Sequence, residues 1–91
     1  MIDCVSLWVA NLLERGDSDE EVGDAAQAVA ASAAVRQALT VAVTNEVGLG
    51  VVPATPLGRR YRDVLGRVNT CWAAAAEEAF LVVAGRKLRL E

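Results

Sequence analysis

Histidine is absent from this 91-residue chain, and aromatic residues make up only 4% of it. Without histidine, Cys4 and Cys71 have no imidazole to join them in a metal site, so we expect two reduced, buried cysteines in a cytoplasmic protein. The first residues lack the basic stretch of a signal peptide. Charge or glycine interrupts every apolar run, which argues against a membrane span.

Alanine and valine supply much of the apolar content, which reaches 54% with a mean hydropathy of +0.31. That composition is typical of a folded chain, and its length suits one small domain over residues 1–91. Small side chains bury little area each, so the core should be thin. We therefore expect a homo-oligomer, or a chain that folds well only beside a further part of its domain.

Acidic and basic residues are unevenly distributed. Residues 1–46 carry eight acids and two arginines, whereas residues 47–91 carry four acids and seven bases. The basic half lacks interleaved aromatic residues, so a solvated helix face explains it better than nucleic-acid binding.

Three helices are predicted from apolar spacing and end signals. The first has the stripe Val5, Trp8, Val9, Leu12 and Leu13, with Gly16 as its stop. The second runs from about Asp19 to Gln37 behind a Ser18/Glu21 capping box, with the inner face Val22, Ala25, Ala26, Val29 and Ala33. The third opens at Thr55 and Pro56, with the stripe Leu57, Tyr61, Val64, Leu65, Val68, Trp72, Ala75, Ala76 and Ala79.

Residues 39–43 and 80–83 have the apolar, β-branched character of strands covered on both faces. Ala84 and Gly85 suit a two-residue turn into an alternating edge strand over 86–90. Residues 1–3 are either the end of a strand or the start of one helix over 1–14. The element order predicts an α/β fold with a mostly parallel sheet, helices on its faces and a C-terminal antiparallel hairpin.

Several segments together resemble one enzyme family. They are IDCVSLWVANLL at 2–13, VTNEVGLGVVP at 43–53, RRYRDVLGRVN at 59–69 and LVVAG at 81–85. In this order and spacing they resemble the C-terminal half of the bifunctional adenosylcobinamide kinase/adenosylcobinamide-phosphate guanylyltransferase family.

That resemblance implies a partial P-loop NTPase-like fold and a role in cobalamin biosynthesis. Members phosphorylate adenosylcobinamide with ATP or GTP and Mg²⁺, then attach GMP through a histidine-linked intermediate. This chemistry uses a glycine-rich Lys-Ser phosphate loop and a nucleophilic histidine, and this sequence contains neither. We therefore expect no bound cofactor, no nucleotide affinity and no activity from this chain alone. The alternative is a non-catalytic structural module derived from the fold.

Asp3, Asn45 and Glu46 are the candidate site residues. The resemblance implies that Asp3 binds nucleotide or magnesium, whereas by itself Asp3 could simply cap the helix that follows. Asn45 and Glu46 follow a predicted strand, so in a parallel sheet they share an edge with Asp3. Asn45 and Glu46 either orient substrate at this edge or only hold the loop that follows the strand in place.

Three arginines near the start of the third predicted helix have two possible roles. Arg59, Arg60 and Arg62 either grip phosphate or a corrin amide edge, or form a solvated face. Because arginine opposes the dipole at a helix N-terminus, a compensating partner is expected.

Overall fold

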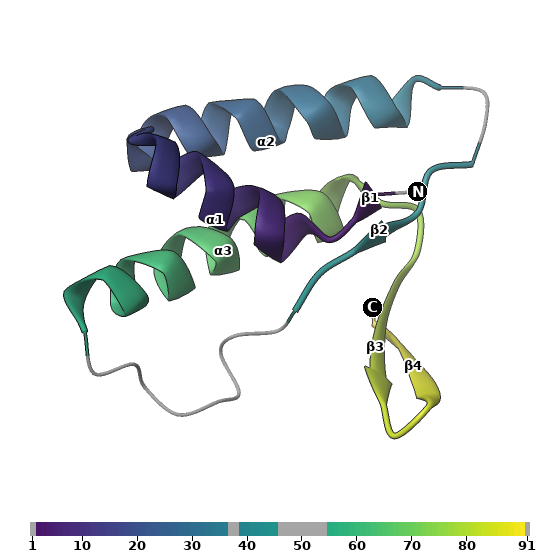
Figure 1. Ribbon diagram of the computed structural model, residues 1–91. Coiled ribbons are helices and arrows are strands. Elements are labelled where there is room, and N and C mark those ends of the chain that lie inside the picture. The colour runs from purple at the N-terminus through teal and green to yellow at the C-terminus, as the bar shows by residue number, and fades with distance from the viewer. Residues whose placement is uncertain (1, 37–38, 46–54, 91) are drawn as a thin grey trace.

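The computed structural model describes residues 2–36, 39–45 and 55–90, and within them it forms an α/β arrangement (Figure 1). The helices pack together, while the strands form two separate pairs. The elements are β1 (Ile2–Asp3), α1 (Val5–Arg15), α2 (Asp19–Ala34), β2 (Ala42–Val43), α3 (Pro56–Ala75), β3 (Ala79–Val83) and β4 (Arg86–Leu90). In the described ranges, no helix is long and apolar enough to cross a membrane.

Local signals set the helix ends as the sequence predicts. Gly16 ends α1 with a φ of 100°, a left-handed conformation that suits glycine. The Ser18 hydroxyl accepts from the Glu21 amide at 3.1 Å, and the Glu21 carboxylate accepts from the Ser18 amide at 2.9 Å. At the start of α3 the Thr55 hydroxyl accepts from the Gly58 amide at 3.0 Å.

Some details of the predicted helices are wrong. Helix α2 ends at Ala34 rather than near Gln37, and its inner face follows a spacing of four through Val22, Ala26 and Ala30. Val29 is consequently 37% exposed. The prediction extended the stripe of α3 too far at both ends, because Leu57 is 65% exposed and Ala79 already belongs to β3.

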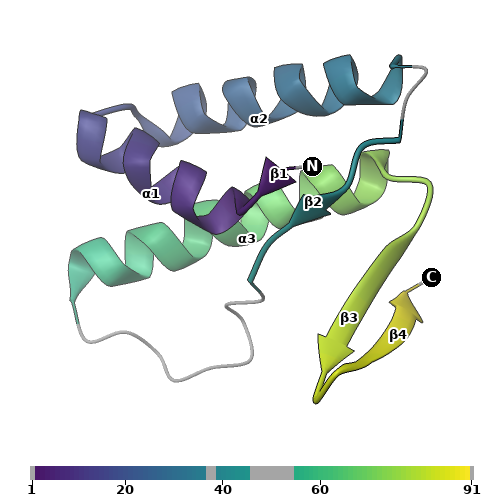
Figure 2. The same cartoon turned by 45° about the vertical axis from the view of Figure 1, so that its right-hand side comes forward.

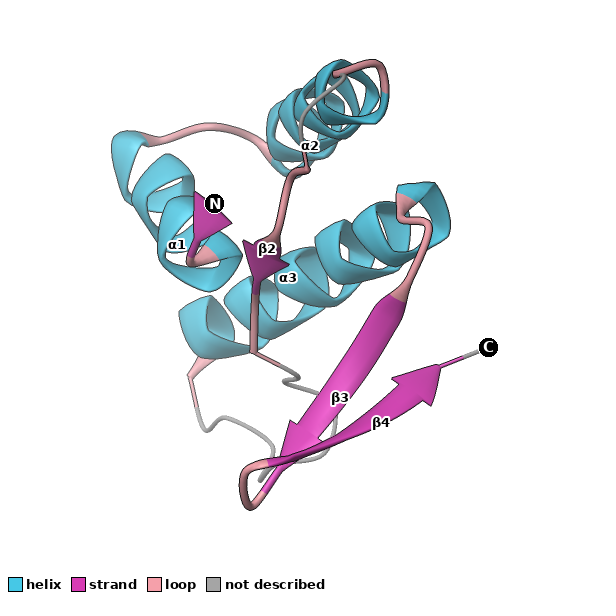
Figure 3. Ribbon diagram, turned by 90° about the vertical axis from the view of Figure 1, so that its right-hand side faces the viewer, coloured by secondary structure: helices cyan, strands magenta, loops and turns pink. Residues whose placement is uncertain are grey.

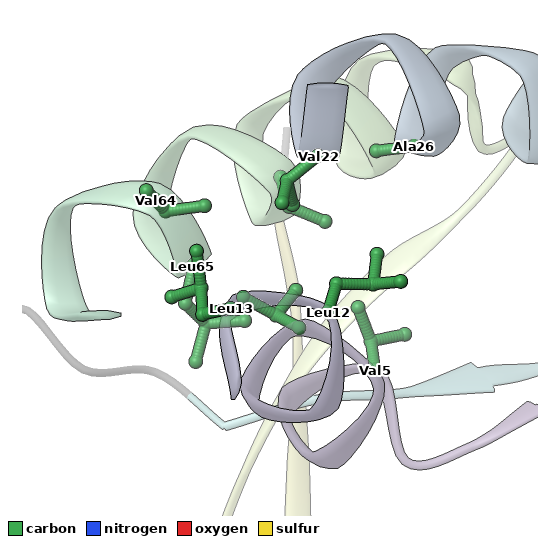
Figure 4. Close-up of a cluster of buried hydrophobic side chains, with 9 residues drawn as sticks. Val5, Leu12, Leu13, Val22, Ala26, Val64 and Leu65 are labelled. Atoms are coloured by element: carbon green, nitrogen blue, oxygen red, sulfur yellow. The ribbon is translucent and has the colours of Figure 1, made fainter. Parts of the chain in front are cut away.

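The core lies between the three helices. Side chains from each helix point toward one another in Figure 4. Five partly buried hydrophobic residues pack against this cluster: Ile2, Trp8, Ala25, Tyr61 and Trp72. Alanine at position 26 lets α2 approach the other helices closely, because its side chain is only a methyl group. The buried cluster comprises Val5, Val9, Leu12, Leu13, Val22, Ala26, Val64, Leu65 and Val68.

Strands β1 and β2 pair in parallel, with Ile2 opposite Ala42 and Asp3 opposite Val43. The Ile2 amide donates to the Val41 carbonyl at 2.7 Å. This pairing holds the first described residues extended, so the alternative of one helix from residue 1 is wrong.

Strands β3 and β4 form the predicted antiparallel hairpin. Ala84 and Gly85 form its two-residue turn, with φ angles of 51° and 76°. Both angles are positive, as a type I′ turn requires. Figures 2 and 3 show the hairpin extending away from α1 and α2.

The prediction that the strands are covered on both faces is wrong for the described residues. Leu39 is 87% exposed, Val41 45% and Val43 42%, and Val82 and Val83 on β3 are 67% and 62% exposed. In the β1–β2 pair, Ile2 packs against the helical core, whereas Val43 stays exposed.

Candidate functional site

The carboxyl ends of β1 and β2 meet at one edge. Asp3 ends β1 directly opposite Val43, which ends β2, and Asn45 follows two residues later. The structure therefore places Asp3 and Asn45 at the same edge, while Glu46 lies outside the described residues. Helix α1 begins at Val5 with Cys4 as its N-cap, so Asp3 precedes the cap position rather than occupying it. The chemical roles assigned to these residues stay predictions.

Ser6 connects Asn45 to the first turn of α1. The Asn45 side-chain amide donates to the Ser6 hydroxyl at 3.1 Å, and the Cys4 sulfur lies 3.1 Å from the same oxygen. Ser6 is only 3% exposed. A buried hydroxyl requires such partners, because an unsatisfied one costs about 1–3 kcal/mol.

Asn69 on α3 holds the segment after β2 with two hydrogen bonds. Its side-chain oxygen accepts from the Thr44 hydroxyl at 2.6 Å, and its amide nitrogen donates to the Asn45 carbonyl at 2.9 Å. A single side chain thus clamps two consecutive residues of the edge.

Tyr61 adds a second link from α3. Its hydroxyl donates to the Ser6 carbonyl at 3.2 Å, which ties the first turn of α1 to α3. The polar cluster at this edge therefore draws on the N-cap and first turn of α1, the segment after β2, and α3. We call it the edge cluster: Cys4, Ser6, Thr44, Asn45, Tyr61 and Asn69.

Helix α1 presents its N-terminus at the same edge. Its first turn contains no acidic residue, and the Cys4 side chain forms no capping hydrogen bond. The positive end of the helix dipole is therefore not offset by acidic side chains of that turn. A negative charge is favoured there, and Asp3, the residue before the N-cap, carries one.

Arg60 and Arg62 pair with acids of this chain. Arg60 donates to Asp19 at 2.6 Å and to the Asp17 carbonyl at 3.0 Å, which links the starts of α2 and α3. Arg62 pairs with Asp63 at 3.1 Å. The expected compensating partner is thus present for Arg60, whose role here is to connect helices.

The next question is whether the described residues could bind a metal ion. No group of three or more His, Cys, Asp or Glu side chains in the described ranges could hold a metal ion. Cys4 and Cys71 are not joined in a disulfide and are partly buried, less than the full burial that was expected. An open groove of about 360 Å³ lies between α2 and α3, lined in part by Asp24, Arg67 and Cys71.

Sequence reasoning missed most of the edge cluster. Ser6 and Tyr61 were assigned no polar role, and Asn69 appeared only as the last residue of a resembling segment. The one available signal was a polar residue, Ser6, at the start of an otherwise apolar helix.

Comparisons with known proteins show the family of the chain. A model of the family described as cobinamide kinase / cobinamide phosphate guanyltransferase matches residues 1–90. The chain is 38% identical to the bifunctional adenosylcobalamin biosynthesis protein CobU of Salmonella typhimurium and 39% identical to CobU of Escherichia coli. CobP of Pseudomonas aeruginosa is 34% identical.

The alignments cover all of this chain but only 57% of each CobU protein and 52% of CobP. The chain thus spans little more than half the length of these relatives. Because the family model matches nearly every residue, this chain belongs to the cobinamide kinase / cobinamide phosphate guanyltransferase family.

Proposed function

We propose that this chain forms part of an enzyme that phosphorylates adenosylcobinamide and then attaches GMP, giving adenosylcobinamide-GDP for cobalamin biosynthesis. Family membership supports the proposal, and the relatives are named for adenosylcobalamin biosynthesis. Among the residues themselves, the observation that carries it is the edge cluster at the carboxyl ends of two parallel strands. Ligands of open α/β sheets bind at such edges.

The rest of the family domain would supply the phosphate loop and the nucleophile. This sequence contains no histidine and no glycine-rich Lys-Ser loop. We therefore propose that the chain alone is inactive, and that with the remaining portion it completes a cytoplasmic, P-loop NTPase-like domain with a mostly parallel sheet.

At the edge, the chain's own contribution would be to place a phosphate-bearing substrate. The N-terminus of α1 provides backbone N–H groups and the positive end of a helix dipole, which suit an anion. Asn69 and Ser6 fix Asn45 against α3 and α1 at this edge.

Asp3 is the proposed magnesium ligand. Magnesium that arrives with a nucleotide takes most of its ligands from phosphate and water and needs only one or two carboxylates. Asp3, at the carboxyl end of β1, would supply one such carboxylate. Bound there, the ion would neutralise phosphate charge.

One observation favours the alternative of a non-catalytic module. The Asn45 amide and carbonyl both bond within the chain, to Ser6 and Asn69. A side chain so engaged can be explained by loop anchoring alone.

The test is a chimera in which the portion of Escherichia coli CobU without a counterpart here is joined to this chain. We expect the chimera to phosphorylate adenosylcobinamide and transfer GMP, and the chain alone to do neither. Asp3→Asn should lower kcat/KM for phosphorylation at least about tenfold. Asp63→Asn is the matched control, because Asp63 pairs with Arg62 on α3.

Activity of the chain alone would overturn its proposed inactivity. A folded but inactive chimera would favour the structural module. Equal effects of the two aspartate substitutions would remove Asp3 as a ligand.

A further inference from the structure

Asn45 is held by side chains of two helices. Its side-chain nitrogen donates to the Ser6 hydroxyl on α1 at 3.1 Å, and its backbone carbonyl accepts from Asn69 on α3 at 2.9 Å. Asn69 also accepts from the hydroxyl of the preceding residue, Thr44, at 2.6 Å. The residue Asn45 is nevertheless exposed. It is therefore fixed in position and still open to a ligand.

Ser6 determines which end of the Asn45 amide faces inward. Ser6 is only 3% exposed, so its hydroxyl depends on protein partners. Its oxygen accepts from Asn45, which leaves its own proton for the Cys4 sulfur, 3.1 Å away. If the amide rotated by half a turn, Ser6 could bond to it only by giving up that proton and leaving the sulfur. The network therefore favours the amide nitrogen on the inner side.

The side-chain oxygen of Asn45 is the group that remains for a ligand. The oxygen and nitrogen of an amide lie on opposite sides of one carbon atom, so a nitrogen directed at buried Ser6 leaves the oxygen on the outer side. Among the described residues none donates to this oxygen, which can accept two hydrogen bonds. An ionised phosphate oxygen brings no proton to such an acceptor, whereas a hydroxyl group does.

This acceptor lies at the edge where ligands of α/β sheets bind. Asn45 follows β2 by two residues, and the carboxyl end of β2 meets that of β1. The N-terminus of α1, the proposed position of phosphate, lies at the same edge. The substrates of the proposed reaction bring hydroxyl groups near phosphate, because a nucleotide carries ribose hydroxyls and a phosphoryl group is transferred to a hydroxyl oxygen.

We propose that the side-chain oxygen of Asn45 accepts a hydrogen bond from a hydroxyl group of a substrate. Ser6 and Asn69 are positioning residues, since they hold that oxygen toward the ligand. The hydroxyl belongs either to the ribose of the nucleotide or to the alcohol that receives the phosphate. The inference rests on the proposed function for its substrates and adds the chemical group that the edge recognises.

Calorimetric titration of the chimera with Escherichia coli CobU tests the proposal. The ligands are GTP, its 2′-deoxy and 3′-deoxy analogues, and adenosylcobinamide with and without its phosphate-accepting hydroxyl. We expect removal of one hydroxyl to weaken binding at least about threefold in the original chimera and not in Asn45→Ala. The analogue that shows this difference identifies the hydroxyl. Asn11→Ala is the matched control and should keep the original dependence, because Asn11 is exposed on α1.

Two further variants examine the orientation of the amide. Asn45→Asp keeps an acceptor oxygen, and Ser6 can donate to its other oxygen, so the dependence on the hydroxyl should be retained. Ser6→Ala frees the amide of Asn45 to rotate and should reduce the dependence. Full dependence in Ser6→Ala would overturn the positioning role of Ser6. Circular dichroism of each variant separates misfolding from a lost contact.

An equal effect of each analogue on the original chimera and on Asn45→Ala would overturn the proposed contact. Because titration requires no turnover, the expected difference in a chimera that transfers no phosphate would contradict the proposed function and leave this inference intact. An active chimera without the difference would do the reverse. Failure to bind either substrate would overturn both.

Discussion

Two leucines of α3 offer a sharp test of the core. The sequence places Leu57 and Leu65 on one apolar stripe, but Leu65 is 0% exposed and Leu57 is 65% exposed. Leu65→Ala removes about three buried carbon atoms, worth about 2.4 kcal/mol at about 0.8 kcal/mol each. The cavity left behind raises the expected loss to about 3 kcal/mol. Leu57→Ala should cost less than about 1 kcal/mol, because most of that side chain is already in water.

Urea and thermal unfolding followed by far-ultraviolet circular dichroism measure this difference. For a domain of this size, about 3 kcal/mol corresponds to a fall in Tm of roughly 12–24 °C. Since domains are stable by only about 5–15 kcal/mol, Leu65→Ala should approach the limit of folding. Equal losses for the two variants would refute the assignment of the core to the space between the helices.

Three further predictions concern the edge cluster, the hairpin turn and the start of α2. Asn69→Ala removes both bonds to the segment after β2, so we expect a loss of about 1 kcal/mol and faster amide exchange at Asn45; Thr70→Ala, which removes a bond within α3, should leave that exchange unchanged. Ala84 has a positive φ of 51°, which asparagine adopts at a lower energetic cost than alanine. Ala84→Asn should therefore stabilise the fold by about 1 kcal/mol and raise Tm. A lower Tm would contradict the turn geometry. Hydrogen bonds from Arg15 lower the pKa of Asp17, so its stabilising contribution is present above the pKa of the unfolded carboxyl and is lost as pH falls through the lower folded pKa. Asp17→Asn should therefore reduce the loss of stability on acidification, and unchanged pH dependence would argue against the pair.

Sequence reasoning succeeded where structure depends on neighbouring residues. Gly16, the Ser18/Glu21 box and the Ala84–Gly85 turn all act through backbone groups a few residues away. It failed at the end of α2, because alanine favours continued helix and no glycine or proline marks the stop. Which of Val29 and Ala30 lies inside depends on how α2 crosses α3, and that is a tertiary property.

Part of the candidate site could also be predicted from the sequence, and part could not. The parallel-edge rule was enough to place Asp3 beside the residues that follow β2. The long-range hydrogen bonds of the edge cluster were not predictable, because they join residues 24 to 55 positions apart. The burial of the strands over 39–43 and 80–83 was predicted wrongly. An apolar sequence indicates that a strand packs against another layer, but it does not show whether that layer belongs to the same chain.

The pairing of β1 with β2 has a consequence for the order of folding. Helices α1 and α2 are joined by a short turn, and the hairpin closes through two residues, so both form from local contacts. Joining Ile2 to Ala42 instead closes a loop of about forty residues for only two residue pairs, at an entropic cost that local contacts avoid. The carboxyl edge therefore assembles after the helices have packed. In pulse-labelling exchange, the amide of Ile2 should gain protection later than those of Val9 and Leu81.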